Sequence, residues 1–216
     1  MINYHPKNEL LSLFTTGGLP ASLSSAIAIH SEMCSTCQEN IDALTEQRAQ
    51  IDFEQTAFNL GDMDINTMIS DITDNDDIDV IKENVAEFIT IKGKQYQLPR
   101  AIKHLSRSKW TSIGNLSRSK INLDEGDIHS SLLHIAPGGM VPEHTHKGYE
   151  LTLLLEGSFK DEMGEYEAGD FILLDNSHKH TPVTENGCLC FTVANDAMHF
   201  TQGINKLLNP IGSFIY

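Results

Sequence analysis

Two short clusters of histidine and cysteine carry the residue types that bind transition metals. The first is His30, Cys34 and Cys37, in the spacing H-x3-C-x2-C. On one continuous helix these residues fall within an arc of about 60°, so one face would present an imidazole and two thiols. Zinc prefers cysteine and histidine ligands, and a structural zinc site needs four of them. The fourth candidate is His5, because no other His or Cys precedes His30.

Other interpretations of this first cluster stay open. The pair Cys34 and Cys37 could form a thiol redox couple, since the C-x2-C spacing suits disulfide exchange. The two could also be buried thiols beside an incidental histidine. A DNA-reading zinc finger is disfavoured, because few basic residues surround the cluster. We therefore predict a structural zinc site made of His5, His30, Cys34 and Cys37.

The second cluster follows the pattern G-x5-H-x-H-x3-E-x6-G from Gly138 to Gly157. His144 and His146 are two residues apart, so on a strand both side chains point the same way, and Glu150 lies at another even offset. Three such ligands suit a first-row transition metal, although they do not distinguish Zn, Mn, Fe or Ni. The alternative is a β barrel whose histidines bind no metal.

The elements that position these clusters divide the chain into a helical part and a β part. Apolar spacing predicts a helix over 7–16, which Gly17-Gly18 ends, and Pro20 opens a second helix that runs to about residue 50. One or two short helices broken at Gly61 are expected over 53–73, and an acidic linker over 74–95. After Pro99, short apolar runs between turn residues predict strands of a sandwich or barrel, at 130–136, 151–155, 171–174 and 189–193.

Both clusters carry a family resemblance. Residues 3–40, with Asn3-Tyr4-His5-Pro6, Gly18-Leu19-Pro20 and the segment from His30 to Cys37, resemble the zinc-binding anti-sigma domain of the ChrR type, which has a cupin domain behind it. The segment from Gly138 to Gly157 resembles the first cupin motif at every fixed position. Gly169-Asp170 and His180-Thr181-Pro182 resemble the second, although Asp175 and Ser177 stand where that motif has Pro and Gly.

This resemblance implies a fold, an activity and site residues. The implied fold is an α + β chain of two domains: a small helical zinc-binding bundle over 1–73, and a cupin β-barrel (an antiparallel double-stranded β-helix or jelly roll) over 96–216. The zinc ligands would be His5, His30, Cys34 and Cys37. In the cupin site His180 would join His144, His146 and Glu150 around a divalent metal, with His178 as its substitute.

The resemblance further implies a regulator rather than an enzyme. The N-terminal domain would bind and inhibit an extracytoplasmic-function (ECF) sigma factor. Release would follow oxidative stress, such as singlet oxygen or an organic hydroperoxide, with help from the cupin domain. The alternative is a metal-dependent cupin enzyme, such as a dioxygenase or isomerase, with an accessory zinc domain. A zinc or redox buffer is a third and weaker interpretation.

Charge and composition limit the partners of this chain. Its 216 residues have a formal net charge of −15, and residues 1–100 hold 6 basic and 16 acidic side chains. This acidity argues against direct nucleic-acid binding, because phosphates attract Lys and Arg, and it favours a basic partner. The N-terminus lacks a basic region followed by an apolar core, and the sequence has no long apolar run. We therefore predict no signal peptide, no membrane span and a cytoplasmic location.

Cys188 and Cys190 form a further pair, two residues apart on a predicted strand. In a reducing compartment such residues are thiols or metal ligands more often than disulfides. Their expected role is as small core residues, since free cysteine is commonly buried. A reactive thiol pair near the cupin metal is the alternative.

Overall fold

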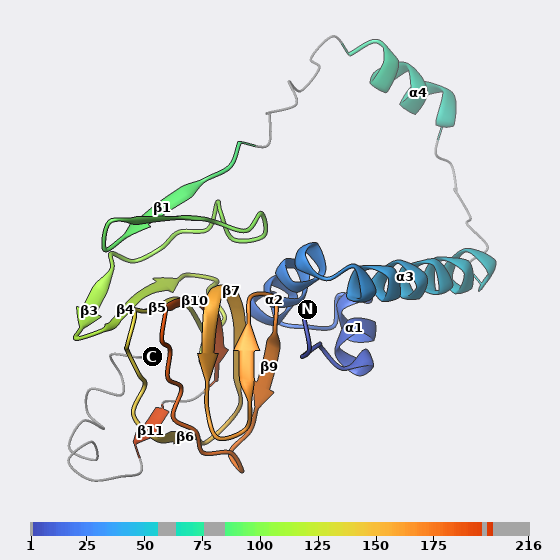
Figure 1. Ribbon diagram of the computed structural model, residues 1–216. Helices are drawn as coiled ribbons and strands as arrows, with labels where there is room; N and C mark the ends of the chain where they lie inside the picture. The colour runs from blue at the N-terminus through green and yellow to red at the C-terminus, as the bar shows by residue number, and fades with distance from the viewer. Residues whose placement is uncertain (1, 56–63, 76–84, 196–197, 201–216) are drawn as a thin grey trace. The chain divides into compact units, whose positions relative to one another are not determined.

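A computed structural model describes residues 2–55, 64–75, 85–195 and 198–200 (Figure 1). It divides into two compact units, which are described separately: Met1–Thr45 with Pro99–Tyr216, and Glu46–Leu98. The helices are α1 (Asn8–Thr15), α2 (Ala21–Met33), α3 (Ser35–Gln55) and α4 (Ile65–Thr73). The strands are β1 (Phe88–Ile91), β2 (Lys94–Gln97), β3 (Thr111–Ile113), β4 (Leu116–Ile121), β5 (His129–Ile135), β6 (His144–His146), β7 (Glu150–Lys160), β8 (Glu165–Glu167), β9 (Phe171–Leu174), β10 (Cys188–Ala194) and β11 (Met198–Phe200).

The first helix ends where the glycine pair predicts. Gly17 adopts a φ of 68°, which favours glycine, and the amide of Gly18 donates to the carbonyl of Leu13 at 2.8 Å. Pro20 is the N-cap residue of α2, so the chain turns back within a few residues of α1. This turn returns the second helix toward the N-terminal segment that carries His5.

The sequence predicts one helix from Pro20 to about residue 50. The structure has two helices there, α2 and α3, so that prediction is wrong. Cys34 has an extended backbone (φ −127°, ψ 103°) between α2 and α3, and its carbonyl accepts the amide of Gln38 at 3.0 Å. Ala26, Ile27 and Ile29 of α2 are buried, whereas α3 is mostly polar. No proline or glycine marks the break, so a pattern of residue types alone could not reveal it.

The C-terminal part of the first unit is an antiparallel β fold, as predicted. One sheet has the order β3-β4-β5-β10-β7-β8, with β9 paired to β7, and β6 pairs with β11. The central strand β10 lies between β5 and β7, and six of its seven residues are buried. Both of its edges are therefore paired, which makes β10 the middle of the core.

The β core is apolar and continuous. Its buried members come from most of the long strands and from the loops that join them, namely Ile135, Val141, Leu154, Phe159, Tyr166, Ile172, Leu174, Cys188, Cys190 and Ala194. Replacing a buried leucine in such a core by alanine lowers the free energy of unfolding by about 2–5 kcal/mol. This β fold can therefore hold its side chains in place without help from a bound ion.

Helix α2 packs against the β fold within the same unit. It contacts β10, and its Ala26 and Ile27 are fully buried. At its N-terminus the backbone amides of Ala21 and Ser22 donate to the carboxylate of Glu125, the Ser22 bond measuring 3.0 Å. A carboxylate at this end of a helix satisfies free amides and complements the helix dipole. The first 45 residues are thus joined to the β fold, while the domain boundaries given above stay a prediction.

The unit Glu46–Leu98 contains the end of α3, helix α4 and a β hairpin. Asp64 caps α4 by accepting from the amides of Asn66 and Thr67. Strands β1 and β2 pair antiparallel across Lys92-Gly93, where φ is 49° and 86°, as a two-residue hairpin turn requires. The predicted linker over 74–95 therefore includes β1, and Gly61 lies outside the described residues. Among the described helices, none is long and apolar enough to cross a membrane.

Candidate metal centres

The structure brings His5, His30, Cys34 and Cys37 together. His30 Nε2 lies 3.3 Å from Cys37 Sγ, and His5 Nδ1 lies 3.4 Å from Cys34 Sγ and 3.5 Å from Cys37 Sγ. All four ligand atoms are within 4.8 Å of one another. Three of the residues are buried and His5 is exposed. The four residues are called the Cys/His centre below.

Each residue of the Cys/His centre comes from a different place in the helical part. His30 is in the last turn of α2, Cys34 at the break, Cys37 in the first turn of α3, and His5 precedes α1. The expected arc on one continuous helix is wrong, because the chain is extended at Cys34. The break instead redirects the chain so that both thiols face His30 and His5.

Burial shifts the pKa of two residues of this centre, His30 and Cys37. Burial lowers the pKa of His30, although its hydrogen bond to the Gly169 carbonyl, at 2.7 Å, opposes the shift. Burial and the neighbouring Cys34 thiol raise the pKa of Cys37 to about 12. A metal ion would have to displace the thiol protons, so its affinity must fall as the pH falls.

The donor set of the Cys/His centre fits a structural zinc ion. Two thiol sulfurs and two imidazole nitrogens give four protein ligands, which complete tetrahedral coordination. The ring of His30 is oriented by the Gly169 carbonyl through Nδ1, which leaves Nε2 for the centre. With four protein ligands the site has no open position for catalysis.

A second cluster contains His144, His146, Glu150 and His180. Their ligand atoms also lie within 4.8 Å of one another, and all four residues are buried. His180 Nε2 is 2.9 Å from His144 Nε2, and Glu150 Oε2 is 2.8 Å from His146 Nε2 and 3.4 Å from His180 Nε2. These residues are called the barrel centre below.

Strand alternation and backbone pairing explain why these residues converge. In β6 the residues His144 and His146 are buried while Thr145 between them is only partly so. His180 exchanges two backbone hydrogen bonds with His144, each 3.2 Å, which fixes its register. The substitute His178 is instead only partly buried, and its Nδ1 atom lies 2.8 Å from Asp175 Oδ1. The structure thus favours His180 over His178.

Burial and charge shape the protonation of the barrel centre. Burial lowers the pKa of His144 to about 4. Burial also disfavours protonated His180, but hydrogen bonds to Asp161 and Glu150 outweigh it and raise the pKa of His180 to about 9. Burial would raise the pKa of Glu150, but the neighbouring imidazoles, His146 first, hold it well below its usual value. Glu150 therefore stays an anion that can bind a cation.

The donor set of the barrel centre fits a divalent transition metal. Three imidazoles and one carboxylate are the ligands expected for Zn, Mn, Fe or Ni, and the set does not choose among them. The Nδ1 atom of His144 contacts the Pro142 carbonyl at 2.8 Å, and the Nδ1 atom of His180 contacts Asp161 at 3.0 Å. Such contacts direct the Nε2 atoms of both rings into the cluster.

Cys188 and Cys190 lie in the β core with their sulfurs 4.0 Å apart. The hydrogen bond that Cys190 donates to Cys188, together with burial, raises the pKa of Cys190 well above its usual value, and the charge of Glu150 adds to the shift. Their burial agrees with a role as small core residues. The effect of Glu150 on Cys190 is the one observation that points toward the alternative, a thiol pair near the metal.

Two contacts to the centres have no recognisable sequence signal. Asp161 lies in the turn after β7 and holds His180, and the Gly169 carbonyl holds His30. The Gly169-Asp170 pair was noted only as the start of a motif. Both contacts join positions far apart in the chain, so spacing could not identify them.

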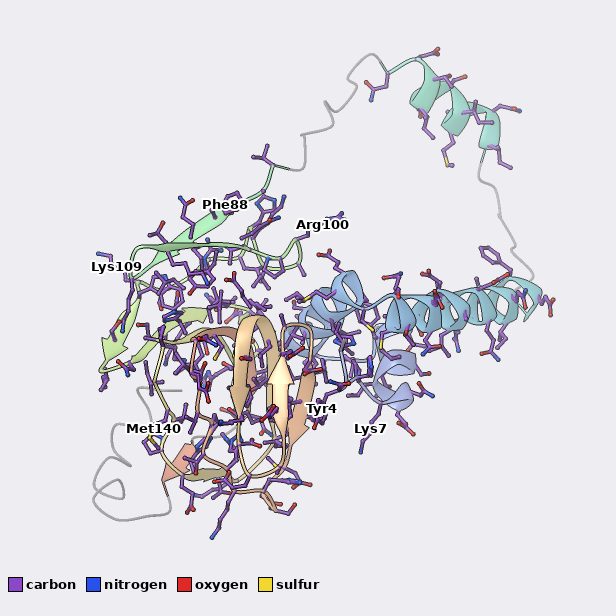
Figure 2. The ribbon with its side chains drawn as sticks, viewed as in Figure 1. Tyr4, Lys7, Phe88, Arg100, Lys109 and Met140 are labelled. Carbon is purple, nitrogen blue, oxygen red and sulfur yellow. The ribbon has the colours of Figure 1, made fainter. Side chains whose placement is uncertain are left out.

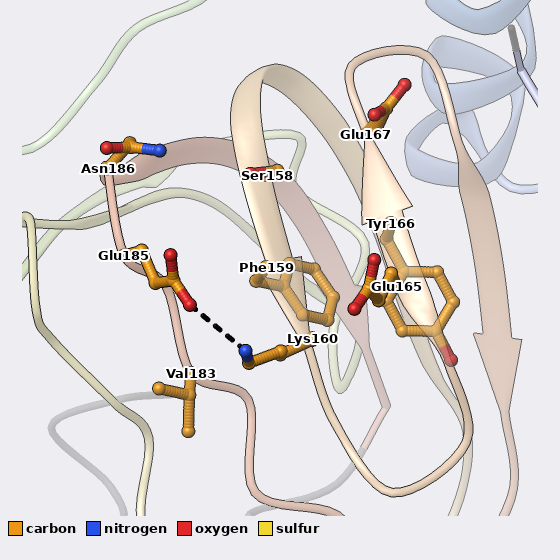
Figure 3. Close-up of a pocket in the computed structure, with 9 residues that line it drawn as sticks. All are labelled: Ser158, Phe159, Lys160, Glu165, Tyr166, Glu167, Val183, Glu185 and Asn186. Atoms are coloured by element: carbon orange, nitrogen blue, oxygen red, sulfur yellow. Dashed lines mark hydrogen bonds and ion pairs between the residues drawn. The ribbon is translucent and has the colours of Figure 1, made fainter.

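A separate surface pocket of about 210 Å³ lies on the β7–β8 hairpin (Figure 3). Lys160 and Glu185 form an ion pair across it at 3.0 Å, both largely exposed. None of the eight predicted ligands lines this pocket. It is therefore not part of either centre.

Comparison with known proteins agrees with this arrangement. Residues 100–197 match the family described as the ChrR cupin-like domain. The anti-sigma-E factor ChrR of Cereibacter sphaeroides is 27% identical over 211 residues, which cover 97% of each chain. A crystal structure of Rhodobacter sphaeroides SigE in complex with the anti-sigma ChrR has a TM-score of 0.67 and 26% identity, covering 90% of this chain and 100% of that chain. Residues 100–197 thus match the ChrR cupin-like domain, in a chain that is similar to the anti-sigma factor ChrR along nearly its whole length.

Proposed function

We propose that this chain is a zinc-dependent anti-sigma factor that binds and inhibits an ECF-type sigma factor. The observation that carries the proposal is the likeness to ChrR over 97% of the chain, since one of the similar structures is ChrR bound to SigE. The Cys/His centre adds the residues that a zinc-dependent fold of the helical part would need. Zinc serves folding there and not catalysis, because four protein ligands close the site.

The apolar surface of α4 supports a protein partner. Four residues form a stripe at the helical spacing i, i+3, i+4 and i+7, and each is between 45% and 67% exposed: Ile65, Met68, Ile69 and Ile72. This set is called the α4 stripe below. A helix nine residues long gains little stability by itself in water. Burying its stripe against a sigma factor would supply both the helix stability and part of the binding energy.

Charge supports the same class of partner. Residues 1–100 hold 16 acidic against 6 basic side chains. Proteins that bind DNA do so through basic surfaces, because the phosphate backbone is negative. An acidic inhibitor therefore complements such a surface and speeds association with it. Occupying that surface would block the sigma factor without any contact between this chain and DNA.

The barrel centre would sense the releasing signal. The buried set of three imidazoles and one carboxylate that would hold a divalent metal lies in the same compact unit as the Cys/His centre. The likeness to ChrR extends over this domain, and oxidative stress, as singlet oxygen or an organic hydroperoxide, is the signal that we propose. Release would then require a change in the barrel to reach the helical part.

Co-purification with candidate ECF sigma factors tests the proposal. The full chain should retain the sigma factor and block its transcription, whereas His30→Ala and Cys34→Ala should lose zinc and inhibition together. His104→Ala is the matched control, since His104 is exposed and lies in neither centre. Full inhibition by a zinc-free His30→Ala, Cys34→Ala double variant would refute zinc dependence.

A further inference from the structure

One stretch of chain contacts a ligand residue in each of the two centres. It runs from Asp161, directly after β7, through β8 to Asp170, directly before β9, and is called the connecting segment below. Asp161 contacts His180 of the barrel centre, and Gly169 contacts His30 of the Cys/His centre. Ten residues thus join two clusters that are distant in sequence.

At the barrel end, Asp161 fixes the ring of His180. Its Oδ2 atom lies 3.0 Å from His180 Nδ1, and the Asp161 side chain is only 1% exposed. Its Oδ1 atom accepts the amides of Met163 at 2.8 Å and Gly164 at 3.1 Å. The turn after β7 is built around the Asp161 carboxylate. A movement of the His180 ring would therefore act on this turn through Asp161.

In the middle, Tyr166 connects Asp161 to the N-terminal segment. Its hydroxyl donates to Asp161 Oδ1 at 3.3 Å, and its ring packs on that of Tyr4 with centroids 4.8 Å apart. Figure 3 shows the Tyr166 ring pointing away from the Lys160–Glu185 pair. Tyr4, labelled in Figure 2, directly precedes His5, and its carbonyl accepts the amide of Phe171 at 2.9 Å.

At the other end, Gly169 and Asp170 hold the helical part. The Gly169 carbonyl accepts from His30 Nδ1 at 2.7 Å. Asp170 is fully buried, and its Oδ1 atom accepts the amides of Asn3 at 2.8 Å and Tyr4 at 3.1 Å. Gly169 has a φ of 97° and no room for a Cβ beside Ile2, so its backbone position is closely constrained.

We infer that the connecting segment couples the two centres, so that binding of a metal in the barrel changes how firmly the Cys/His centre holds zinc. When His180 binds through Nε2, its Nδ1 must donate, and Asp161 is held as the acceptor. The same carboxylate accepts from Tyr166, which packs on the residue before His5. The inference rests on the two metal centres of the proposed function and adds a thermodynamic link between them.

The test measures zinc release from the full-length protein without any sigma factor. Zinc transfer to a chromogenic chelator is followed with the barrel loaded with Mn²⁺ and with the barrel left empty. We expect the two rates to differ by about 5-fold in the wild type. Asp161→Asn should abolish the difference, and Tyr166→Phe, which keeps the ring but removes the hydroxyl, should reduce it.

The matched control is Asp175→Asn. Asp175 also contacts a histidine, His178, but Asp175 is exposed, His178 is only partly buried, and both lie outside the connecting segment. The control should keep the wild-type difference between the two rates. Equal release rates with and without Mn²⁺ in the wild type would overturn the inference, as would an unchanged difference in a folded Asp161→Asn variant.

Two features keep this test decisive. If Asp161→Asn does not fold, Tyr166→Phe decides, because it removes one hydroxyl and keeps the aromatic contact with Tyr4. Because no sigma factor is present, a chain that couples its centres but fails to bind sigma refutes only the proposed function. A chain that binds sigma with uncoupled centres refutes only the coupling.

Discussion

The two centres are assembled in opposite ways. The Cys/His centre takes its ligands from helix ends, an extended residue and the segment before α1, and His5 is exposed. The barrel centre takes its ligands from paired strands and a bridged loop, and all four are buried. One centre is at the junction of short elements, whereas the other is inside a fold that has its own core.

This difference indicates what each metal does for the protein. Around the Cys/His centre only Leu11 is buried in α1, and α2 buries Ala26, Ile27 and Ile29. A bound ion there would add to this small set of apolar contacts, as in other small zinc domains. The barrel has a continuous apolar core, so a metal bound there could be lost or changed without unfolding, as the proposed sensing role requires. Removing each metal in turn tests this contrast.

The largest effect is expected from Cys37→Ser. Structural zinc contributes on the order of 10–16 kcal/mol of apparent binding energy in small zinc domains, so losing one ligand should lower affinity by at least about 1,000-fold. Zinc content by mass spectrometry and helicity by far-UV circular dichroism should fall together. Cys188→Ala, which removes a thiol from the β core, is the control and should keep this zinc. Normal helicity in zinc-free Cys37→Ser would show that the helical part folds without zinc and would refute the contrast between the two centres.

A smaller effect is expected from His144→Ala in the barrel. The barrel metal should be lost, while the β fold and the zinc of the Cys/His centre remain, since the core does not depend on the ion. The free energy of unfolding should fall by about 1–3 kcal/mol, the range of most single substitutions. Metal analysis and thermal unfolding measure both outcomes. Simultaneous loss of both metals would show that the barrel, too, needs its ion to fold.

The metal-free barrel should also depend on pH. The folded pKa of His180 is raised to about 9 from 6.5. A raised pKa stabilises the folded state fully below pH 6.5, and this contribution is lost as the pH rises through about 9. A loss on the order of 2 kcal/mol is expected over that window, seen by urea unfolding of the metal-free chain. His180→Gln should flatten the profile, and an equally steep profile in this variant would exclude His180 as the cause.

The smallest effect is expected from Ile69→Asp in the α4 stripe. This change leaves both centres intact, so it separates partner binding from metal binding. The affinity for the sigma factor should fall about 10-fold, or 1.4 kcal/mol, because a charge replaces buried apolar surface. Isothermal titration gives the affinity. Ser70→Asp adds the same charge off the stripe and should bind normally; equal losses in both variants would count against the stripe.

Sequence reasoning was sufficient where spacing is local. The two histidines of β6 and the short Cys/His spacing indicated both clusters, because a strand or a helical turn fixes neighbours a few residues apart. The break at Cys34 had no such signal, since helix ends depend on tertiary contacts and no glycine or proline stands there. The choice of His180 over His178 needed the backbone pairing with His144. The roles of Asp161 and Gly169 could be found only from their contacts in the folded structure.

The buried carboxylate of Asp170 has a consequence for how this protein can be divided. Its Oδ2 atom accepts the amide of Glu167, but its Oδ1 atom accepts the amides of Asn3 and Tyr4, so a fragment that starts after the helices would leave Oδ1 inside the β fold without these partners. Leaving a buried acceptor without its hydrogen-bond partners is costly. Fragments of the cupin region should therefore be expressed together with the first residues, and a bulky tag fused close to Asn3 is best avoided.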